Sequence, residues 1–512
     1  MEVITLFKYL ALFLGTYLIT KQLIQRFFKF SKLPPSPSLA LPIIGHLHLF
    51  KKPLHLFLGR LAAQHGPVLY LRFGSRPVVL LSSTSAVEES LVRSDVFVDR
   101  PRLVAGKYNG FDFSNIAWAP MGPHWRNLRR VAAVEVLSPQ RLHTLLEVRD
   151  NVARTFLGWM MKEITLNGVV EMKSAIFRLT LDNMMRMLVG YSFYEEVKGQ
   201  DKEETFRKLQ KIVEDSFRLG GVSNMEDFMP IIKVFKSVFG SPEVKFKELM
   251  DEKLDFMKGL MEEHIEMEKE GKLNETRKKS MLHVLLCLQK DDPKYYSNEM
   301  IQSFIWTLYQ GGTDTSSATA VWAMSLLINH PQVLKKAQAE IDALLGNERL
   351  VKESDRINLP YVQCIVNETL RMYPAGPAAL PYVANADTKV AGYQIPKGTM
   401  LLYNIWAIHN DPKVWDEPRK FKPERFMDFE ENKFGNSFMP FGVGRRVCPG
   451  EHLARRIVWL AVAILAQCFD WETVDGEMVD MEEGGGQTSF KVEPLLAKCR
   501  PRPGMMNVLS QL

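Results

Sequence analysis

The cysteine of a glycine-rich loop is the residue of this chain best suited to chemistry. Cys448 lies in the run Phe441-Gly442-Val443-Gly444-Arg445-Arg446-Val447-Cys448-Pro449-Gly450, and an apolar, helix-compatible segment over residues 453–468 follows. Backbone N–H groups and the positive end of a helix keep a thiolate deprotonated and able to bind a metal. Gly444 and Gly450 permit backbone conformations closed to other residues, and Arg446 can supply positive charge to an anionic cofactor edge. The loop predicts a thiolate metal ligand; for Cys448 alone, the alternative is a packed free cysteine.

A second reactive pattern, Gly311-Gly312-Thr313-Asp314-Thr315-Ser316, falls inside a long apolar segment that begins at Ser297 and ends at His330-Pro331. Serine caps helices and proline stops them, so this segment is expected to be one helix. Two glycines inside a helix cost roughly 1 kcal/mol each relative to alanine, and close approach to a flat cofactor, with a local kink, would offset that. The Thr315 hydroxyl is expected to donate to the Gly311 carbonyl. The alternative, a solvent-facing Thr/Ser stretch, conflicts with the apolar flanks.

The pattern Phe-x-x-Gly-x-Arg-x-Cys-x-Gly, met at Phe441, Gly444, Arg446, Cys448 and Gly450, resembles the haem-thiolate signature of the cytochrome P450 monooxygenases. The resemblance implies haem b with Cys448 as the ligand of its iron, the other four residues around the haem, and Arg446 at a haem propionate. It also implies O₂ as co-substrate and NADPH-derived electrons delivered by an NADPH–cytochrome reductase. The thiolate pushes electron density toward the bound oxygen and favours cleavage of the O–O bond.

Two further pairs match motifs of the same family. Asp314 and Thr315 match the acid–alcohol pair of the oxygen-activation motif, in which the hydroxyl holds a water and the carboxylate links the site to bulk protons. Trp125 and Arg129 match the Trp-x-x-x-Arg pair that binds haem propionates; the alternative is a packed tryptophan beside a surface arginine. Tyr382 departs from the pattern, because many relatives carry His or Arg there, and a propionate contact at this position would lack positive charge.

Glu368 and Arg371 lie three residues apart on an expected helix. Taken alone, they predict a surface ion pair worth about 0.2–0.5 kcal/mol. Together with Arg425 in the run Pro423-Glu424-Arg425-Phe426, they resemble the buried ion-pair network of the family. That resemblance implies an architectural role on the proximal side of the haem rather than a chemical one.

Substrate contacts are inferred only from position in the resembled family. The implied residues are mostly aromatic and aliphatic, which suits an apolar or aromatic substrate; for each of them, a plain place in the core is the alternative. They are Phe111, Phe113, the segment 217–228, Leu308, Gly312, Ala378, Ala379, Leu380, Thr488 and Ser489.

The rest of the chain must position these residues, and its patterns predict a mainly α-helical fold with small β-sheets. Helical patterns dominate residues 124–288, with breaks near 220–221 and 240–242, and a later helix over 361–372 stops at Pro374. Strands are expected at 68–73 and 77–81, with shorter ones near 388–395 and 399–402, and a helix at 84–93. Residues 101–122 are expected to form a loop, and residues 484–512 a hairpin and edge strands.

The N-terminus differs from the rest. Residues 3–19 are almost all apolar, just long enough to span a bilayer as a helix, and Lys21, Arg26, Lys29 and Lys32 follow. The apolar run predicts a single-pass anchor at residues 1–20, in contact with lipid, and the positive charge places the body in the cytosol. The family resemblance implies that this membrane is the endoplasmic reticulum. A cleaved signal peptide is the alternative, but no small-x-small cleavage site follows. Residues 21–45 are expected to be a basic, proline-rich hinge and residues 46–512 the catalytic domain.

Composition narrows the classes of function. The 512 residues are 46% hydrophobic, enough for a large core, and the net charge of +6 is too diffuse to indicate a nucleic-acid partner. The five cysteines are far apart without paired spacing, which argues against a disulfide framework or a zinc site and fits a reducing compartment.

The resemblance covers the whole chain with its motifs in family order. The runs Asn367-Glu368-Thr369-Leu370-Arg371 and Ala497-Lys498-Cys499-Arg500-Pro501-Arg502-Pro503 are similar to the plant microsomal branch and to its isoflavone hydroxylases and lignan methylenedioxy-bridge synthases. They imply a membrane-bound monooxygenase that hydroxylates an apolar or aromatic plant specialised metabolite of the isoflavonoid, flavonoid, lignan or terpenoid class. Arg445, Arg455 and Arg456 are expected to face the acidic surface of the reductase.

Two other functions stay open. The same oxidant can join phenolic rings or close a methylenedioxy bridge without net oxygen insertion. A non-catalytic, haem-bearing membrane scaffold is the second alternative, and the intact pair of Asp314 and Thr315 argues against it.

Overall fold

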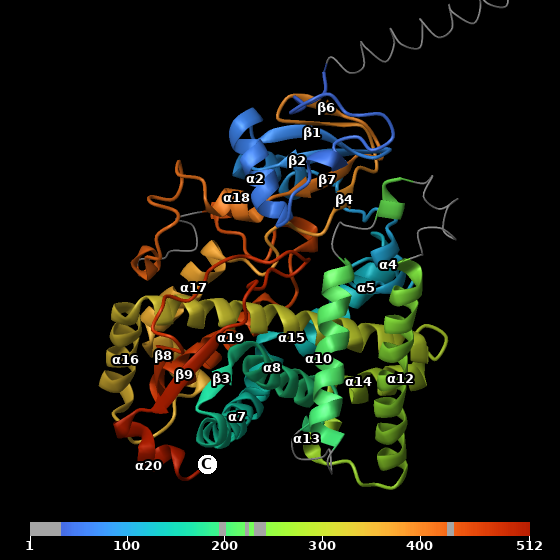
Figure 1. Cartoon of the computed structure of the whole chain (residues 1–512). Coiled ribbons are helices and arrows are strands. Elements are labelled where there is room, and N and C mark those ends of the chain that lie inside the picture. Colours follow the sequence, from blue (N-terminus) through green and yellow to red (C-terminus); the bar gives the residue numbers. More distant parts are fainter. Residues whose placement is uncertain (1–31, 194–200, 221–224, 230–241, 428–434) are drawn as a thin grey trace, which may run out of the picture.

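The computed structural model describes residues 32–193, 201–220, 225–229, 242–427 and 435–512. Over these ranges no helix combines the length and the apolar character needed to cross a bilayer. The anchor expected at residues 1–20 lies outside the described residues, and so does the first part of the hinge, residues 21–31. The expected mainly helical fold with small sheets is confirmed: a sheet-rich region sits at one end of a large helical body (Figure 1).

The sheet-rich region is built on a four-stranded sheet with the strand order β1-β2-β7-β4. Its strands are β1 (Val68–Phe73), β2 (Arg76–Leu81), β7 (Met400–Tyr403) and β4 (Tyr382–Val383), and a separate hairpin joins β5 (Thr388–Val390) to β6 (Tyr393–Ile395). The strands expected near these positions are confirmed. Alternate residues pack in two clusters, with Leu80 on the side of α2 (Leu54–His65) and Leu81 on the other. Because both faces are buried, β2 is a continuous apolar run.

Most of the chain between residues 123 and 345 is helical, as the sequence pattern predicts. The helices are α5 (Pro123–Val131), α6 (Pro139–Thr144), α7 (Leu146–Asn167), α8 (Met172–Leu188), α10 (Asp201–Gly220), α12 (Pro242–Lys269), α13 (Glu275–Lys278), α14 (Met281–Asp291), α15 (Asn298–Asn329) and α16 (Pro331–Leu345). The expected breaks are confirmed by the end of α10 and the start of α12.

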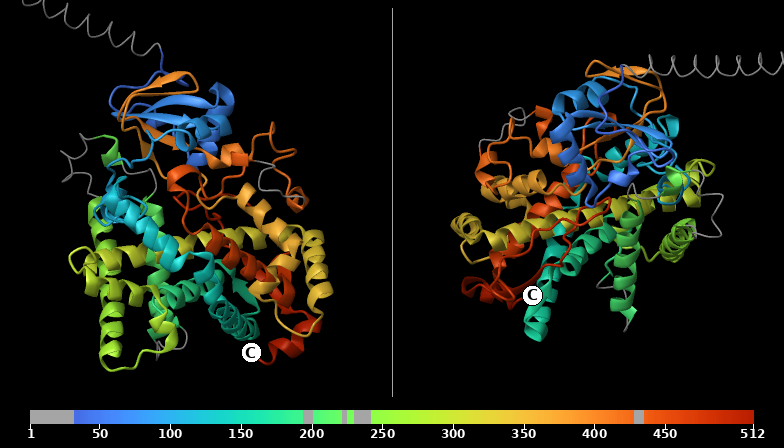
Figure 2. Two further views of the ribbon diagram at one scale, coloured as in Figure 1. Left: turned by 180° about the vertical axis from the view of Figure 1, so that it is seen from behind. Right: turned by 45° about the horizontal axis from the view of Figure 1, so that its top comes forward.

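The long helix α15 runs through the middle of the body in every view (Figure 1, Figure 2). Its start and end are the predicted ones, because the Ser297 side chain accepts from the backbone N–H of Met300 and Pro331 begins the next helix. Most side chains from Ile301 to Leu327 are buried, except on a stripe near the middle of the helix. The helix continues without interruption through its two glycines. A helix that is buried on nearly all sides belongs in the core. The packing around α15 therefore holds its residues in fixed positions.

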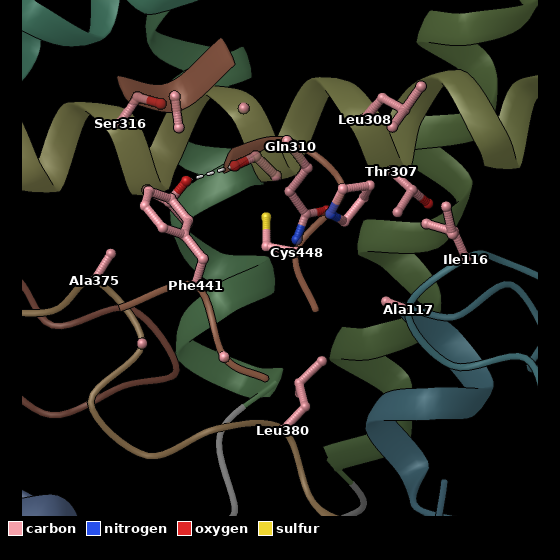
Figure 3. Close-up of a pocket in the computed structure, with 18 of the residues that line it drawn as sticks. Ile116, Ala117, Thr307, Leu308, Gln310, Ser316, Ala375, Leu380, Phe441 and Cys448 are labelled. Atoms are coloured by element: carbon pink, nitrogen blue, oxygen red, sulfur yellow. Dashed lines mark hydrogen bonds between the residues drawn. The ribbon is translucent and has the colours of Figure 1, made fainter. Parts of the chain in front are cut away.

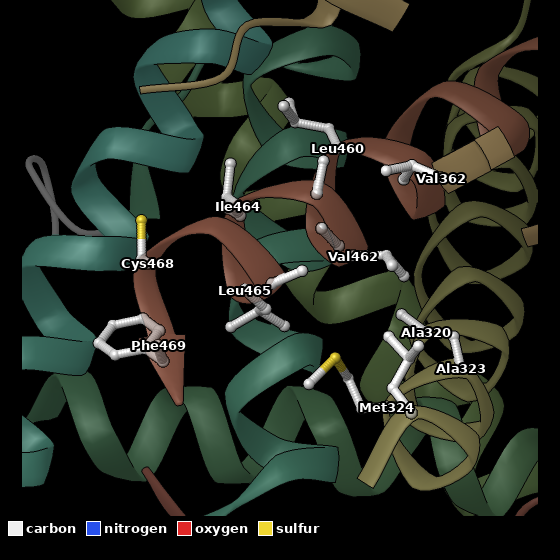
Figure 4. Packing of buried hydrophobic residues seen from close by; sticks show 14 of the residues in the cluster. Ala320, Ala323, Met324, Val362, Leu460, Val462, Ile464, Leu465, Cys468 and Phe469 are labelled. Atoms are coloured by element: carbon white, nitrogen blue, oxygen red, sulfur yellow. The ribbon is translucent and has the colours of Figure 1, made fainter. Parts of the chain in front are cut away.

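Two further helices, α17 (Pro360–Met372) and α19 (Glu451–Cys468), pack with α15 in the largest apolar cluster. Figure 4 shows Ala320 and Met324 of α15 near Val362 of α17 and Leu465 of α19. Small residues such as Ala320 let the helices approach closely. Since the Cys448 loop directly precedes α19, this packing fixes the loop relative to α15.

Three segments differ from the sequence predictions. Residues 84–93 form α3 (Thr84–Val87) followed by a π-helical turn at Glu88–Val92 rather than one regular helix. The expected loop at 101–122 contains a short helix, α4 (Val104–Tyr108). In the C-terminal tail, β9 (Leu496–Pro501) is the central strand between β3 (Val169–Glu171) and β8 (Phe469–Thr473), not an edge strand, and α20 (Met506–Leu509) follows it. These pairings join distant parts of the chain, which local patterns do not reveal. The short helix α18 (Ile405–His409) completes the fold.

Candidate functional site

A cavity of about 380 Å³ lies between α15 and the loop that carries Cys448. Its other walls come from the segment between α4 and α5, from α5 itself and from the residues after α17. Figure 3 shows Thr307, Leu308, Gln310 and Ser316 along α15, with the Cys448 sulfur pointing toward that helix from the opposite side. The cavity therefore brings together the two reactive patterns of the sequence.

The Cys448 side chain is open to this cavity and enclosed by protein elsewhere. Its backbone N–H donates to the Phe441 carbonyl at 3.0 Å, which closes the loop. Burial raises the pKa of the Cys448 thiol, while the backbone N–H of Gly450 and the Arg129 guanidinium oppose that shift. The N-terminus of α19 begins three residues later, at Glu451. Its positive end and these donors offset part of the effect of burial, and they are the groups that would stabilise a thiolate bound to a metal.

The glycines of the loop have different roles. Gly450 and Phe441 line the cavity, as expected for residues around a cofactor. Gly444 does not line it, which corrects the expectation of a cofactor contact there. Its φ is 77°, and a Cβ atom at this residue would lie 2.1 Å from the Leu91 carbonyl oxygen. Gly444 is therefore required by backbone conformation and by close packing against the π-helical turn.

Arg129 and Arg446 converge on one side of the cavity with Trp125. Arg446 lies 4.8 Å from the centre of the Trp125 ring and donates to the Val98 and Ala119 carbonyls, while its buried Nη1 has no partner within the described chain. Arg129 donates to the Val447 carbonyl at 2.8 Å. The indole N–H of Trp125 donates to the Ile116 carbonyl at 3.1 Å, so in this structure the tryptophan orients the arginines.

Arg100 is a third cation of the cavity wall that the motif analysis missed. Its guanidinium donates to the Ala117, Leu380 and Pro381 carbonyls and lies 4.2 Å from the centre of the Tyr382 ring. Tyr382 has no charge, but Arg100 supplies one directly above it. No local signal could have found this residue, because the contact joins parts of the chain 280 residues apart.

Three arginines lie close together in the cavity wall, and their mutual repulsion would be relieved by a bound anion. Burial, then Arg100, and also Arg129, lower the pKa of Arg446 to about 9, against the opposite effects of Tyr382 and Asp99. None of the three arginines forms an ion pair with a described carboxylate. A flat ligand with a metal centre above a thiol and acidic groups at one edge, such as haem with its propionates, fits this donor set.

On α15, Thr315 faces the cavity and its hydroxyl donates to the Gly311 carbonyl at 2.6 Å, the bond that the spacing predicts. Gly311 also lines the cavity and nothing lies within 4 Å of the position of its missing Cβ atom. A Cβ atom on Gly312 would lie 2.5 Å from the sulfur of Met184 in α8. Gly312 therefore lines the cavity by its backbone and permits close packing of α8 on the other side.

Asp314 does not face the cavity with Thr315. Its side chain is buried (1% exposed), and neither oxygen forms a hydrogen bond of normal geometry with a described residue. Burial raises its pKa to about 7, and the Thr488 hydroxyl and Lys173 partly oppose the shift, while Glu214 adds to it. Successive helix residues point about 100° apart, so the acid and the alcohol occupy different sides of α15. Lys173 and Glu214, paired at 3.0 Å and partly exposed, lie on the side of the acid.

We expect the Asp314→Asn variant to be more stable than the native protein above pH 7. The pKa of Asp314 is raised to about 7 from 3.8, so between these values the folded protein keeps a proton that the unfolded chain releases. The free energy of unfolding therefore falls as pH rises through that window, by up to about 4 kcal/mol. Urea titrations at pH 5 and pH 8 would show this loss in the native protein and not in the variant. An equal loss in both would contradict the assignment.

Glu368, Arg371 and Arg425 form a buried network beneath the site. Arg371 makes two hydrogen bonds to the Glu368 carboxylate, at 2.7 and 2.9 Å, and Arg425 adds a third at 3.1 Å. Arg371 also donates to the His409 and Pro418 carbonyls, and the Glu368 and Arg371 side chains have no exposed surface. The network joins α17 to the segment before the Cys448 loop. This position indicates a structural role.

The expected substrate residues divide into two groups. Leu308, Gly312, Ala379 and Leu380 line the cavity, as does Phe217. The others lie elsewhere in the described chain: Phe111, Phe113, Ala378, Thr488, Ser489 and Phe228. Left-handed φ angles of 49° at Phe111 and 59° at Phe113 give the backbone a tight turn there, and both rings pack in apolar clusters instead. Residues 221–224 lie outside the described chain.

The C-terminal segment packs in the core and contributes one residue to the cavity wall. The Ser489 hydroxyl donates to Glu483, and its carbonyl accepts from the indole of Trp322 at 2.8 Å. The neighbouring Gln487 does line the cavity, although the sequence analysis placed the contacts one and two residues later. An irregular segment has no periodicity from which its facing residues can be read.

The surface expected to meet the reductase is less basic than predicted. The Arg455 and Arg456 side chains are 17% and 29% exposed and pair with Glu451 and the buried Glu353. Only Arg445 is well exposed, at 60%, and it forms an ion pair with Asp95. All three arginines are therefore paired within the protein, and two of them are largely covered.

A buried lysine, Lys253 of α12, lies behind the cavity wall. It is 1% exposed, and its ammonium group donates to the Asn109 side chain at 2.8 Å. Burial lowers its pKa to about 7. Between pH 7 and the ordinary value of 10.5 the unfolded chain binds the extra proton, so the free energy of unfolding rises with pH across that window.

The Lys253→Met variant is expected to lose this pH dependence. At pH 7 removal of the desolvated amine should stabilise the fold by ~3–5 kcal/mol. Loss of the hydrogen bond to Asn109 offsets about 1 kcal/mol of this gain. Urea midpoints at pH 7 and pH 9.5 would show a steep rise in the native protein and a flat response in the variant. Lys258 on the same helix, with a side chain 65% exposed, provides the control: Lys258→Met should leave the rise intact.

Comparison with known proteins agrees with this geometry. The cytochrome P450 family profile matches residues 34–498. Cytochrome P450 81F2 of Arabidopsis thaliana is 43% identical over 93% of this chain and 94% of its own. The (+)-piperitol/(+)-sesamin synthase of Sesamum radiatum is 41% identical over 100% and 99%, and the isoflavone 2'-hydroxylase of Glycyrrhiza echinata is 37% identical over 100% of both chains.

The fold is also found among solved structures. A zebra fish cytochrome P450 with abiraterone matches with a TM-score of 0.71 and 25% identity, over 88% of this chain and 100% of that chain. The resemblances inferred from the Cys448 loop and from the C-terminal run are confirmed by these matches.

Proposed function

Because the chain belongs to the cytochrome P450 family of monooxygenases, which use haem with a thiolate iron ligand, O₂ and NADPH-derived electrons from a reductase, we propose that it hydroxylates an apolar or aromatic plant specialised metabolite. We place the substrate in the isoflavonoid, flavonoid, lignan or terpenoid class. The observation that carries the proposal is the Cys448 sulfur pointing toward α15 (Figure 3), across a largely apolar cavity that Thr315 and Gly311 of that helix also line.

We assign the cofactor contacts as follows. Cys448 is the thiolate ligand, and Arg129, Arg446 and Arg100 hold the acidic edge of the haem, with Trp125 fixing the orientation of two of these arginines. When bound, haem supplies the oxidising power for attack on a C–H bond. The protein supplies an apolar wall that excludes water and holds the substrate against α15.

We assign proton handling to two different sides of α15. The Thr315 hydroxyl can hold a water in the cavity, while Asp314 lies toward Lys173 and Glu214, which reach solvent. A carboxyl group with a pKa near 7 can take up and release a proton at the operating pH. Protons would reach the cavity from that side.

The Thr315→Ala variant should consume NADPH without forming product in proportion. Without the hydroxyl, no side chain at this position holds the water that delivers protons, so product per NADPH should fall by about tenfold or more. Hydrogen peroxide and product, each measured against NADPH, give the ratio directly. Thr315→Ser keeps the hydroxyl and should restore most of the coupling. Equal coupling in the native and alanine proteins would remove Thr315 from the mechanism.

A second function, ring coupling or methylenedioxy-bridge closure without net oxygen insertion, remains a candidate because the (+)-piperitol/(+)-sesamin synthase is among the similar proteins. One experiment separates the candidates. Microsomes with this protein and its reductase are given NADPH and a panel of isoflavonoids, lignans, simple phenolics and triterpenoids, and product masses are read. Gain of one oxygen supports hydroxylation; loss of two hydrogens without added oxygen supports coupling or closure. No NADPH-dependent product from any compound would favour the scaffold alternative.

We also propose that residues 1–20 anchor the protein in the endoplasmic reticulum membrane, with a hinge at 21–45 and a cytosolic catalytic domain at 46–512. Lys21, Arg26 and Lys29 after the apolar run support the orientation. In the described part of the hinge, Leu39 and Ile43 are 91% and 65% exposed, as expected for side chains that contact lipid.

A further inference from the structure

We propose that the side-chain amides of Gln310 and Gln487 bind an oxygen acceptor on the substrate. An aromatic ligand with an ether, carbonyl or hydroxyl oxygen is then preferred to the matching hydrocarbon. The inference rests on the proposed function for the aromatic class of the ligand. Both glutamines line the cavity, and neither belongs to a sequence motif of the haem site.

The polar groups of the cavity form a continuous arc. Asn109, Asn115 and Thr307 all line it, and they are joined by hydrogen bonds: the Asn115 amide donates to the Asn109 carbonyl at 2.9 Å and to the Thr307 hydroxyl at 3.0 Å. Gln310 lies one turn after Thr307 on α15. Gln487 and Asn109 both lie against Gly220, where a Cβ atom would be 2.6 Å from the Gln487 Oε1 and 3.1 Å from the Asn109 Nδ2.

The middle of the arc is already saturated by the protein. Asn115 Oδ1 accepts from the backbone N–H groups of Ala117 and Trp118, so both ends of its amide are fully used. Asn109 Oδ1 accepts from the buried Lys253, and its Nδ2 donates to the Ser216 carbonyl at 2.7 Å. These bonds make the wall rigid. The side-chain amides of Gln310 and Gln487 are therefore the groups of the arc that can still bind a ligand.

The orientation of the Gln310 amide follows from its neighbour. The indole N–H of Trp306 donates to Gln310 Oε1 at 2.8 Å. An indole N–H is only a donor, so the oxygen of the amide must face Trp306 and the NH₂ group must face away. No hydrogen bond from that NH₂ group to another residue occurs in the described part of the chain. On a cavity wall it offers donors alone and so selects an acceptor.

Gln487 brings a second free amide to the cavity, at the end of the arc next to Asn109. Its backbone N–H donates to the Phe217 carbonyl at 3.4 Å, which holds the segment against the end of α10. Its side chain has no hydrogen-bond partner among the residues that the structure describes. An unsatisfied amide beside an apolar ligand would cost binding free energy, and an oxygen on the ligand removes that cost.

The test uses three ligands that share one aromatic frame: biphenyl, 4-methoxybiphenyl and 4-hydroxybiphenyl. Each is titrated into the full-length, haem-loaded protein in microsomes, and the change of iron spin state gives the dissociation constant without turnover. The native protein should bind the two oxygenated ligands about fivefold to tenfold more tightly than biphenyl. Gln310→Met and Gln487→Met should each reduce that ratio toward one.

Two variants separate recognition from structure. Gln310→Glu keeps an acceptor for Trp306 but replaces the NH₂ group by an oxygen, so it should lose affinity for the methoxy ligand and keep affinity for the hydroxy ligand, which can donate. Gln338→Met removes a buried amide on α16, bonded to the Ala466 and Phe469 carbonyls, outside the cavity wall. This control should leave both ratios, each oxygenated ligand against biphenyl, unchanged.

Equal binding of biphenyl and 4-methoxybiphenyl by the native protein would overturn the proposal, and so would an unchanged ratio in both methionine variants. Absence of any spin-state change with all three ligands would also overturn it. None of these outcomes bears on the oxygen count of the products, so failure here is distinguishable from failure of the proposed monooxygenase function.

Discussion

Replacing Cys448 with alanine is expected to abolish the thiolate-type spectrum of the reduced, carbon monoxide-bound haem and to reduce turnover by at least 10²-fold, on the order expected when a catalytic metal loses its essential ligand. The Cys448 sulfur is the one thiol that opens on the cavity within the described chain. The three arginines and Trp125 remain in the variant, so some haem can still bind without a sulfur ligand.

Two other cysteines make the test specific. Cys364, 2% exposed, is buried beside Trp415 and Phe426, and Cys287 is exposed on α14. Cys364→Ala should lower stability by about 1–2 kcal/mol through the lost packing of a buried side chain and leave the spectrum unchanged, and Cys287→Ala should change neither. Retention of the thiolate spectrum in Cys448→Ala, or its loss in Cys364→Ala, would refute the ligand assignment.

The parts of the site that could be predicted are those encoded in short spacings. The Cys448 loop, the bond from Thr315 to Gly311 and the spacing of Glu368 and Arg371 each depend on residues within one loop or one helix turn. Such spacings translate directly into geometry, since a helix places residues three and four apart on one face. The same rule could have separated Asp314 from Thr315, because adjacent helix residues face different sides.

The parts that could not be predicted depend on contacts between distant segments. Arg100 and Gln487 reach the cavity because the fold brings the segment around residue 100 beside β4 and the C-terminal segment beside α10. Phe111 and Phe113 resemble pocket residues by composition, yet a left-handed turn directs the chain so that Phe111 packs in the core and Phe113, partly buried, against another apolar cluster. Family position gives the right region of the chain, but the backbone of an irregular segment decides which side chain faces the ligand.

Removal of one partner from the Glu368–Arg371 pair should have the second large effect. Both side chains have no exposed surface, and Arg371 also binds the His409 and Pro418 carbonyls. A buried charge left without its partner costs roughly 3–5 kcal/mol. Glu368→Gln and Arg371→Met are therefore each expected to lower the urea midpoint strongly and to release haem, since the network supports the segment that leads to the Cys448 loop.

The double variant Glu368→Met/Arg371→Met decides whether the loss arises from unpaired charge. Without either charge, only the two carbonyls that Arg371 satisfied and the contacts of Arg425 and Lys422 with Glu368 are lost. The double variant should thus be more stable than the sum of the single effects predicts, by at least about 1 kcal/mol. Lys336, paired with Glu424 at the surface with both side chains 52% exposed, is the control, and Lys336→Met should cost less than about 1 kcal/mol. Strict additivity of the two single effects would show that the ion pair itself contributes little, and would assign the role of this network to its bonds with the backbone.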